Sequence, residues 1–159
     1  MAANHNYGAG SNAKLATCHD EIVLVMGQAL EMTPPYLDIT IVHGFRNKAE
    51  QNGIDPRFTT KRWPASYHNA EDADGEPCSD ACDFAPYIML PSGKMGIPWK
   101  DTHLFSYLAG IVQAAANHLG IDITWGGDFD RDGSTEDQSL GDYGHIQRRN
   151  AAPRPSAED

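Results

Sequence analysis

Two long segments with helical periodicity, set among short segments that read as strands, limit the folds open to this chain. Apolar side chains recur at spacings of three and four residues over 11–30 and 101–119, as in helices with one buried face. A further short helix is predicted over 47–52. The predicted strands are 38–43, 84–90, 121–125 and 143–147. Helices and strands do not alternate with the rhythm of a parallel sheet, so we predict an α+β fold: a single domain with a small, mostly antiparallel sheet flanked by helices.

The two long helices carry residues that suit a helix end. Ser11 or Asn12 is expected to cap the first helix, and the Thr-Pro-Pro sequence at 33–35 is expected to end it. Asp101 is expected to cap the second helix, and Gly120 to stop it.

The length of the chain fits one domain. A chain of 159 residues can bury a sizeable core without a metal ion or a disulfide bond to hold it. We expect a flexible N-terminus at 1–10, a folded domain at 11–147 and a disordered tail at 148–159. The tail begins with an Arg148-Arg149 pair, which we expect to be solvated.

Composition excludes several classes of protein. The 12 basic and 22 acidic residues give a formal net charge of −10, so the chain is not expected to bind nucleic acid by bulk charge. The longest aliphatic run, 22–26, is far shorter than the ~20 residues of a membrane span, and no secretory signal is visible. Cys18, Cys78 and Cys82 are too few for a disulfide scaffold. We read them as free thiols; a local bridge or a metal pair between Cys78 and Cys82 is the alternative.

Histidine and aspartate are the residues of this chain best suited to catalysis. A catalytic zinc takes three protein ligands, commonly histidine and carboxylate, and keeps one position open for water. His68, Asp83 and His145 can supply such a set. Asp142, three residues before the last of these, can act as a general base. His43, on a predicted strand, is read as a core histidine in preference to a group that supports the site.

An acidic loop forms a second candidate metal site. Asp128, Asp130 and Asp132 have the spacing of the first half of an EF-hand calcium loop. The twelfth position, where an EF-hand has a bidentate glutamate, is Ser139, and no flanking EF-hand helices are evident. The loop is therefore a candidate calcium site, with an acidic surface turn as the alternative.

Six short motifs follow one another along the chain. They are 11–15 (SNAKL), 44–51 (GFRNKAEQ), 66–68 (SYH), 81–86 (ACDFAP), 125–129 (WGGDF) and 142–145 (DYGH). In this order the chain resembles the phage L-alanyl-D-glutamate peptidases, which are grouped with the zinc D-Ala-D-Ala peptidases and the hedgehog-like fold. The joint order of the motifs, more than any one of them, makes the resemblance specific.

The resemblance implies a metal centre and a base. By it, His68, Asp83 and His145 are the zinc ligands and Asp142 is the catalytic base. Zinc would polarise the carbonyl of an amide and lower the pKa of a water, and the base would take the proton of this water and later give one to the leaving amine.

The resemblance also implies three residues that meet the substrate. Arg46 would bind a substrate carboxylate or the developing oxyanion, because its guanidinium is planar and permanently charged. Gln51 and Ser66 would line the substrate cleft.

The chain departs from the family pattern around its metal ligands. The family places the aspartate seven residues after the first histidine, where this chain has Gly75; Asp83 comes fifteen residues after it. We expect an eight-residue insertion in the acidic loop between them, with Asp74 and Asp80 as rival ligands. The residue two after the last histidine is often glutamate in relatives and is Gln147 here, which is expected to change a contact behind that ligand.

By the resemblance, the function is that of a zinc-dependent peptidoglycan endopeptidase that cleaves the L-Ala–D-Glu bond of the stem peptide. The biological role would be that of a phage endolysin, a monomer that stays in the host cytoplasm until a holin releases it and then acts on the periplasmic cell wall.

Three alternatives remain open. A D,D-carboxypeptidase or dipeptidase of the same superfamily would share the metal site, but these relatives usually carry glutamate where Asp142 stands. A non-catalytic wall-binding or virion module with the zinc fold would have no need of this base. A calcium-binding protein would leave His68 and His145 unexplained.

Overall fold

A computed structural model describes residues 5–157. Two helices stand where the sequence predicted a single helix over 11–30. Helix α1 spans Ala9–Leu15 and α2 spans Asp20–Met32. Between them, the backbone of Thr17 and His19 hydrogen-bonds to Ser79 on both sides, which takes these groups away from a continuous helix. The expectation of one helix was wrong because pairing with a distant segment outweighs local periodicity.

The helix caps match the sequence at α4 but not at α1. Gly8 precedes α1 without a side-chain cap, while the Ser11 hydroxyl accepts a hydrogen bond from Ile41 N in the neighbouring strand. In α4, Thr102–Leu119, Asp101 accepts a hydrogen bond from Leu104 N as predicted. Gly120 ends α4 in the left-handed conformation, with φ of 70°.

The sheet is small and antiparallel throughout, as predicted. Its strands are β1 Asp38–His43, β2 Ala81–Met89, β3 Met95–Gly96, β4 Ile123–Trp125 and β5 His145–Arg148. The order is β1-β2-β5-β4, and β3 pairs with the far end of β2. Two short elements complete the fold, helix α3 at Lys48–Asn52 and the 3₁₀ turn η1 at Tyr67–Asn69.

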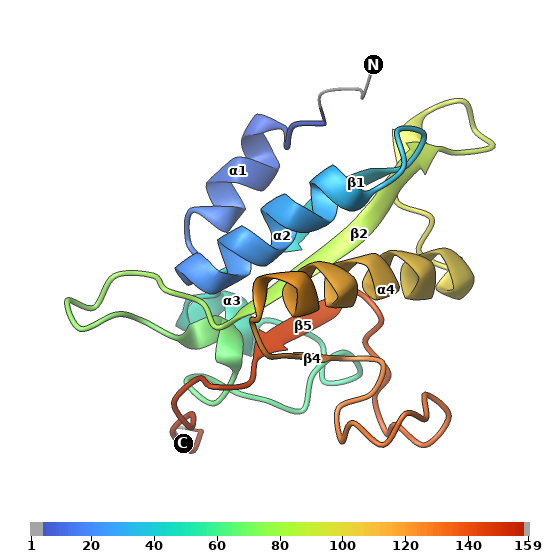
Figure 1. The fold of residues 1–159 in the computed structure, drawn as a ribbon. Helices are drawn as coiled ribbons and strands as arrows, with labels where there is room; N and C mark the ends of the chain where they lie inside the picture. The colour runs from blue at the N-terminus through green and yellow to red at the C-terminus, as the bar shows by residue number, and fades with distance from the viewer. Residues whose placement is uncertain (1–4, 158–159) are drawn as a thin grey trace.

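Helices α2 and α4 lie side by side over one face of the sheet and enclose the core (Figure 1). Ile22, Ile41, Phe84 and Leu108 are almost fully buried there. The buried face of α4 comprises Phe105, Leu108, Ala109, Val112, Ala115 and Ala116. The apolar periodicity predicts a buried face of Leu104, Leu108, Ile111, Ala115 and Leu119; Leu108 and Ala115 are buried, Leu104 and Ile111 are half-buried, and Leu119 at the end of the helix is exposed.

Strand alternation separates the core from the candidate site. Along β5, Ile146 is buried in the core, whereas His145 and Gln147 line a cavity. Along β2, Cys82 belongs to the core and Asp83 to that cavity. Successive side chains of a strand point to opposite faces, so each strand serves the core with one set and the site with the other.

The ends of the chain are tied to the domain within the described residues. The Tyr7 hydroxyl donates a hydrogen bond to Met26 O, and α1 begins at Ala9, two residues before the predicted domain boundary. The segment 149–157 has neither helix nor strand, but the Arg154 guanidinium donates hydrogen bonds to Pro64 O and Asn69 O. Of the predicted flexible N-terminus, 1–4 lie outside the described residues. No helix in the described part of the chain is long and apolar enough to span a bilayer.

Arg148 is not a solvated tail charge, contrary to expectation. It is the last residue of β5, and its side chain is only 14% exposed. Its guanidinium donates to Glu21 at the start of α2 and to Asp80, with N···O distances of 2.6 Å in both cases. The strand continues past the predicted boundary, so a charge that looked terminal joins α2 to the segment that enters β2.

Replacing Arg148 with alanine is expected to lower the free energy of unfolding by about 2 kcal/mol, because Asp80 would remain buried without its partner. Urea denaturation measures the change. Arg149→Ala is the control: Arg149 is 53% exposed and 3.6 Å from Asp122, and its loss should cost no more than about 0.5 kcal/mol. Equal effects of the two substitutions would contradict the assigned role of Arg148.

Candidate active site

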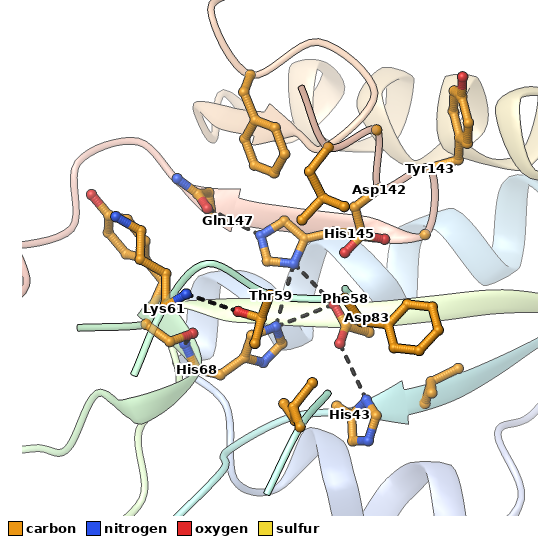
Figure 2. A pocket seen from close by; sticks show the side chains of 18 of the residues that line it. His43, Phe58, Thr59, Lys61, His68, Asp83, Asp142, Tyr143, His145 and Gln147 are labelled. Atoms are coloured by element: carbon orange, nitrogen blue, oxygen red, sulfur yellow. Dashed lines mark hydrogen bonds and ion pairs between the residues drawn. The ribbon is translucent and has the colours of Figure 1, made fainter. Parts of the chain in front are cut away.

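A cavity of about 880 Å³ opens beside the sheet, and the predicted metal ligands lie in its wall. His43 from β1, Asp83 from β2 and His145 from β5 line it, together with the segments 58–61, 65–68 and 138–144. Figure 2 shows the two histidines His68 and His145 with Asp83 pointing toward one another in this wall.

The three predicted zinc ligands form a tight triangle. His68 Nε2 lies 3.1 Å from Asp83 Oδ1 and 3.3 Å from His145 Nδ1, and His145 Nδ1 lies 2.9 Å from Asp83 Oδ1. Their side chains are 2%, 14% and 10% exposed. Tetrahedral zinc with bonds of 2.0–2.1 Å would separate its ligand atoms by about 3.3 Å, so this set fits the ion.

Strand register brings two of these ligands together. Asp83 is the Cα partner of His145 on β5 and, across the other edge of β2, of His43 on β1. Side chains at paired positions point to the same face and lie within contact distance. The ligands are therefore neighbours although 62 residues separate them along the chain.

The remaining ligand, His68, is held by the turn before β2 and by a glycine. Ser66 caps η1, and its hydroxyl accepts a hydrogen bond from His68 N. His68 Nδ1 lies 2.7 Å from Gly44 O, so Nδ1 donates and Nε2 presents its lone pair to the centre. A Cβ at Gly44 would collide with Lys14 O and the Thr17 hydroxyl, and this explains why a glycine stands there.

The rival aspartates lie elsewhere. Asp80 is paired with Arg148, and Asp74 is exposed in a turn where Asp72 accepts its backbone N–H. The segment before β2 forms an exposed turn that is closed by a bridge between Glu71 and Pro77, and its origin as an insertion stays a prediction.

Burial and charge set the proton affinities of the three groups. Burial lowers the pKa of His68. Burial alone would raise the pKa of Asp83, but the charge of His68 and hydrogen bonds from His145 and His43 hold it well below its usual value. Burial would lower the pKa of His145, but its hydrogen bond to Asp83 and the charge of that carboxylate raise it. The carboxylate stays ionised, as a metal ligand must be.

His43 belongs to the site and not to the core, so the preferred interpretation of this residue was wrong. Its side chain is 51% exposed, and Nδ1 lies 3.2 Å from Asp83 Oδ2. The β1–β2 pairing is irregular between Ile41 and His43, and this bulge turns His43 out of the alternating pattern of β1.

Arg46 reaches the same carboxylate. Its Nη2 forms an ion pair with Asp83 Oδ2 and lies 3.4 Å from His43 Nδ1. Within the described residues, Arg46 Nε is the buried side-chain polar atom that has no hydrogen-bond partner. The guanidinium thus lies beside the predicted metal centre, and its buried Nε–H has no hydrogen-bond partner.

The predicted base lies beside His145 (Figure 2). Asp142 precedes His145 in a turn whose backbone is fixed by hydrogen bonds between Gly126 and both residues. A Cβ at Gly126 would collide with Asp142 O, so this glycine of the WGGD motif allows the turn to pack closely against it. Burial, and then the charge of Asp83, raises the pKa of Asp142, which suits a group that must both take and return a proton.

Ser66 and Gln51 differ in their relation to the cavity. Ser66 is in its wall. Gln51 is 1% exposed and does not belong to the lining residues; its amide donates to Lys61 O at 3.0 Å and accepts from Asn69 Nδ2 at 3.3 Å. Asn69, which the sequence did not single out, also donates to Arg46 O. Gln51 and Asn69 thus form a buried amide pair that fixes the backbone at Lys61 and at Arg46.

Gln147 supplies the contact behind the last ligand. His145 Nε2 lies 3.0 Å from Gln147 Oε1, so this ring nitrogen donates to the amide oxygen and leaves Nδ1 free for the centre. A neutral amide increases the basicity of the ring less than a carboxylate does.

The acidic loop brings its three carboxylates together. Asp128, Asp130 and Asp132 place carboxylate oxygens within 4.8 Å of one another. Both oxygens of Asp128 accept backbone N–H groups of the loop itself. Calcium binding there stays a prediction.

Cys18, Cys78 and Cys82 are free thiols, as predicted.

Comparison with known proteins assigns the family. Residues 3–148 match the family described as phage L-alanyl-D-glutamate peptidase. The chain belongs to this family. It is 34% identical over 146 residues to the L-alanyl-D-glutamate peptidase of Escherichia phage T5, which covers 89% of this chain and 96% of that protein. The resemblance that the motif order suggested is thereby confirmed.

A solved structure confirms the fold. The crystal structure of the Serratia marcescens L-Ala D-Glu endopeptidase ChiX matches with a TM-score of 0.62 at 24% identity, over 89% of this chain and 88% of that one. The family of L-alanyl-D-glutamate peptidases and the buried His68-Asp83-His145 group together assign the chain to the peptidases and give it a candidate metal site.

Replacing His68 with alanine is expected to weaken zinc binding at least about 100-fold. In the wild type, affinity should fall as pH is lowered, and the fall should begin at a higher pH than for an ordinary histidine site. The reason is that Asp83 raises the pKa of His145, whose proton competes with the ion. Competition titration with a chromophoric chelator measures both effects. His118→Ala, on the exposed side of α4, should bind like the wild type; a wild type that takes up no zinc would contradict the assignment.

Proposed function

We propose that this peptidase is a zinc-dependent endopeptidase that cleaves the L-Ala–D-Glu bond of peptidoglycan stem peptides. The observation that carries the proposal is the triangle of His68, Asp83 and His145, with its 2.9–3.3 Å edges, in the wall of an open cavity. The family and its phage T5 member support the choice of bond.

The residues divide the work of hydrolysis. Zinc, when bound, would act as a Lewis acid on the scissile carbonyl and lower the pKa of a water. Asp142 accepts the proton of the attacking water and returns a proton to the leaving amine of D-Glu. Its raised pKa helps the second of these transfers.

Arg46 and His43 affect the charge around Asp83. Both contact Asp83 Oδ2, the carboxylate oxygen other than the one shared by the two ligand histidines. The permanent charge of Arg46 beside the centre stabilises the oxyanion that develops when the carbonyl is attacked.

Asp142→Asn keeps the shape of the side chain but removes its basicity, and is expected to lower kcat by about 10²–10⁴ with zinc content preserved. Mass spectrometry of digested peptidoglycan should show stem peptides cut between L-Ala and D-Glu for the wild type, and none for the variant or with a zinc chelator.

Two other results of the same digestion would contradict the proposal. Loss of terminal D-Ala would assign the chain to the D,D-carboxypeptidase branch. A folded, zinc-loaded wild type that cuts nothing would leave a non-catalytic wall-binding or virion module.

We further propose that the enzyme is a phage endolysin that acts as a monomer and reaches the wall through a holin. The family is a phage family, and no helix of the described residues could span a membrane on its own. Cytoplasmic expression in a Gram-negative host should therefore be tolerated until a holin is co-expressed, and then cause lysis. Culture turbidity reports the outcome, and Asp142→Asn with the same holin is the control. Rapid lysis without a holin would contradict this route.

A further inference from the structure

A second cavity of about 540 Å³ adjoins the first. Thr60, Lys61, Ala65 and Tyr67 line both cavities, so the two share this part of their walls. The rest of the second cavity is formed by Arg62 and by the tail segment 153–157.

The wall of this second cavity is cationic. Lys61, Arg62 and Arg154 line it, and no Asp or Glu is among its described lining residues. None of the three forms an ion pair with a carboxylate in the part of the chain that the structure describes. The chain as a whole has 22 acidic and 12 basic residues, so this wall opposes the overall charge.

The backbone that carries these charges is fixed. The buried Gln51 amide donates to Lys61 O, and Lys61 N donates to the Thr59 hydroxyl, as Figure 2 shows for the latter pair. Arg62 Nη1 donates to Asn52 O at 3.4 Å. A wall held in this way needs little ordering when an anion binds.

The tail contributes to the wall through Arg154. Its Nε and Nη2 donate to Pro64 O at 3.3 and 3.1 Å, and Nη2 also donates to Asn69 O at 3.1 Å. These bonds hold the tail against the segment that precedes His68, beside which it lies in Figure 1. Carbonyl partners leave the positive charge of the guanidinium uncompensated, and it therefore remains available to an anion.

The proposed substrate has a strongly asymmetric charge. On the L-Ala side of the scissile bond, the stem is joined through a neutral lactyl group to neutral amino sugars. On the other side, D-Glu carries a free α-carboxylate, and stems that contain diaminopimelate carry another next to it. Anions of this kind are what fixed guanidinium and ammonium groups recognise.

We propose that the cavity of Lys61, Arg62 and Arg154 binds the carboxylates of the stem peptide on the D-Glu side of the scissile bond. The proposal rests on the proposed function, and it fixes the direction in which the stem lies: D-Glu and its successor toward the tail, L-Ala and the sugar toward the opposite end of the first cavity. Residues of the C-terminal tail thereby become part of the substrate site.

Binding of the dipeptide γ-D-glutamyl-diaminopimelate tests the cavity without catalysis. Isothermal titration should give a Kd that is roughly three- to tenfold weaker for Lys61→Gln and for Arg154→Gln than for the wild type. Lys94→Gln is the control, because Lys94 is exposed and lines neither cavity. The amidated dipeptide, without free carboxylates, should bind the wild type as weakly as it binds Lys61→Gln.

Kinetics separate this inference from the proposed function. Lys61→Gln should raise KM for an L-Ala–D-Glu peptide by the same factor, with a much smaller change in kcat, and should no longer prefer D-Glu over D-isoglutamine. A wild type that binds the dipeptide but cuts neither the D-Glu peptide nor the D-isoglutamine peptide would refute the proposed function and leave the binding proposal standing.

Three results would contradict the proposal that this cavity binds the carboxylates. They are dipeptide affinities of Lys61→Gln and Arg154→Gln equal to that of Lys94→Gln, an undiminished preference for carboxylate over amide in Lys61→Gln, and binding of inorganic phosphate at this wall as tight as that of the dipeptide. Arg154→Lys, which keeps the charge but not the planar fork, guards against a purely structural effect: it should retain more affinity than Arg154→Gln if charge is what matters.

Discussion

The site depends on one carboxylate that four cationic or cationisable groups share. Asp83 lies on the central strand β2, and the register places a histidine opposite it on each neighbouring strand. His68 and His145 meet its Oδ1, and His43 and Arg46 meet its Oδ2. An ionised, largely buried carboxylate is stable only when it is paired in this way. The sheet, the 3₁₀ turn and the β1 bulge thus converge on one side chain, and a shift of one residue in β2 would turn it to the core face.

The sequence predicted the elements whose signals are local. β1 and the short helix α3 occur where expected, as do α4 and its two caps, because alternation, helical periodicity and capping act within one segment. The break between α1 and α2 was missed, since it arises from backbone pairing with Ser79, some 60 residues away in a loop without periodicity. Arg148 was misjudged for the same reason: its two partners come from α2 and from the entry to β2.

The candidate site was predictable as a set of residues, but not as an arrangement. Motif order identified His68, Asp83, His145 and Asp142, and it allowed Asp83 to be placed beyond an insertion because the strand after it keeps its pattern. It did not show that Gln51 acts from behind the wall, since burial depends on how α3 packs against the turn at Asn69. Nor did it reveal Lys61, whose position in the wall depends on a backbone bond from that buried amide.

The net charge of −10 looks unsuited to an enzyme whose substrate is anionic. At physiological ionic strength the Debye length is about 8 Å, so charges farther than this from the bound stem contribute little to its binding. What matters is the local charge. The first cavity has Asp83 and Asp142 among its lining residues but also Arg46 and Lys61, whereas the second has Lys61, Arg62 and Arg154 and no acidic side chain among its described lining residues. In the proposed binding mode, a substrate with a neutral half and an anionic half would be oriented by this difference before any specific contact forms, because no acidic side chain among the described lining residues of the second cavity offsets the attraction of its cations for the carboxylates.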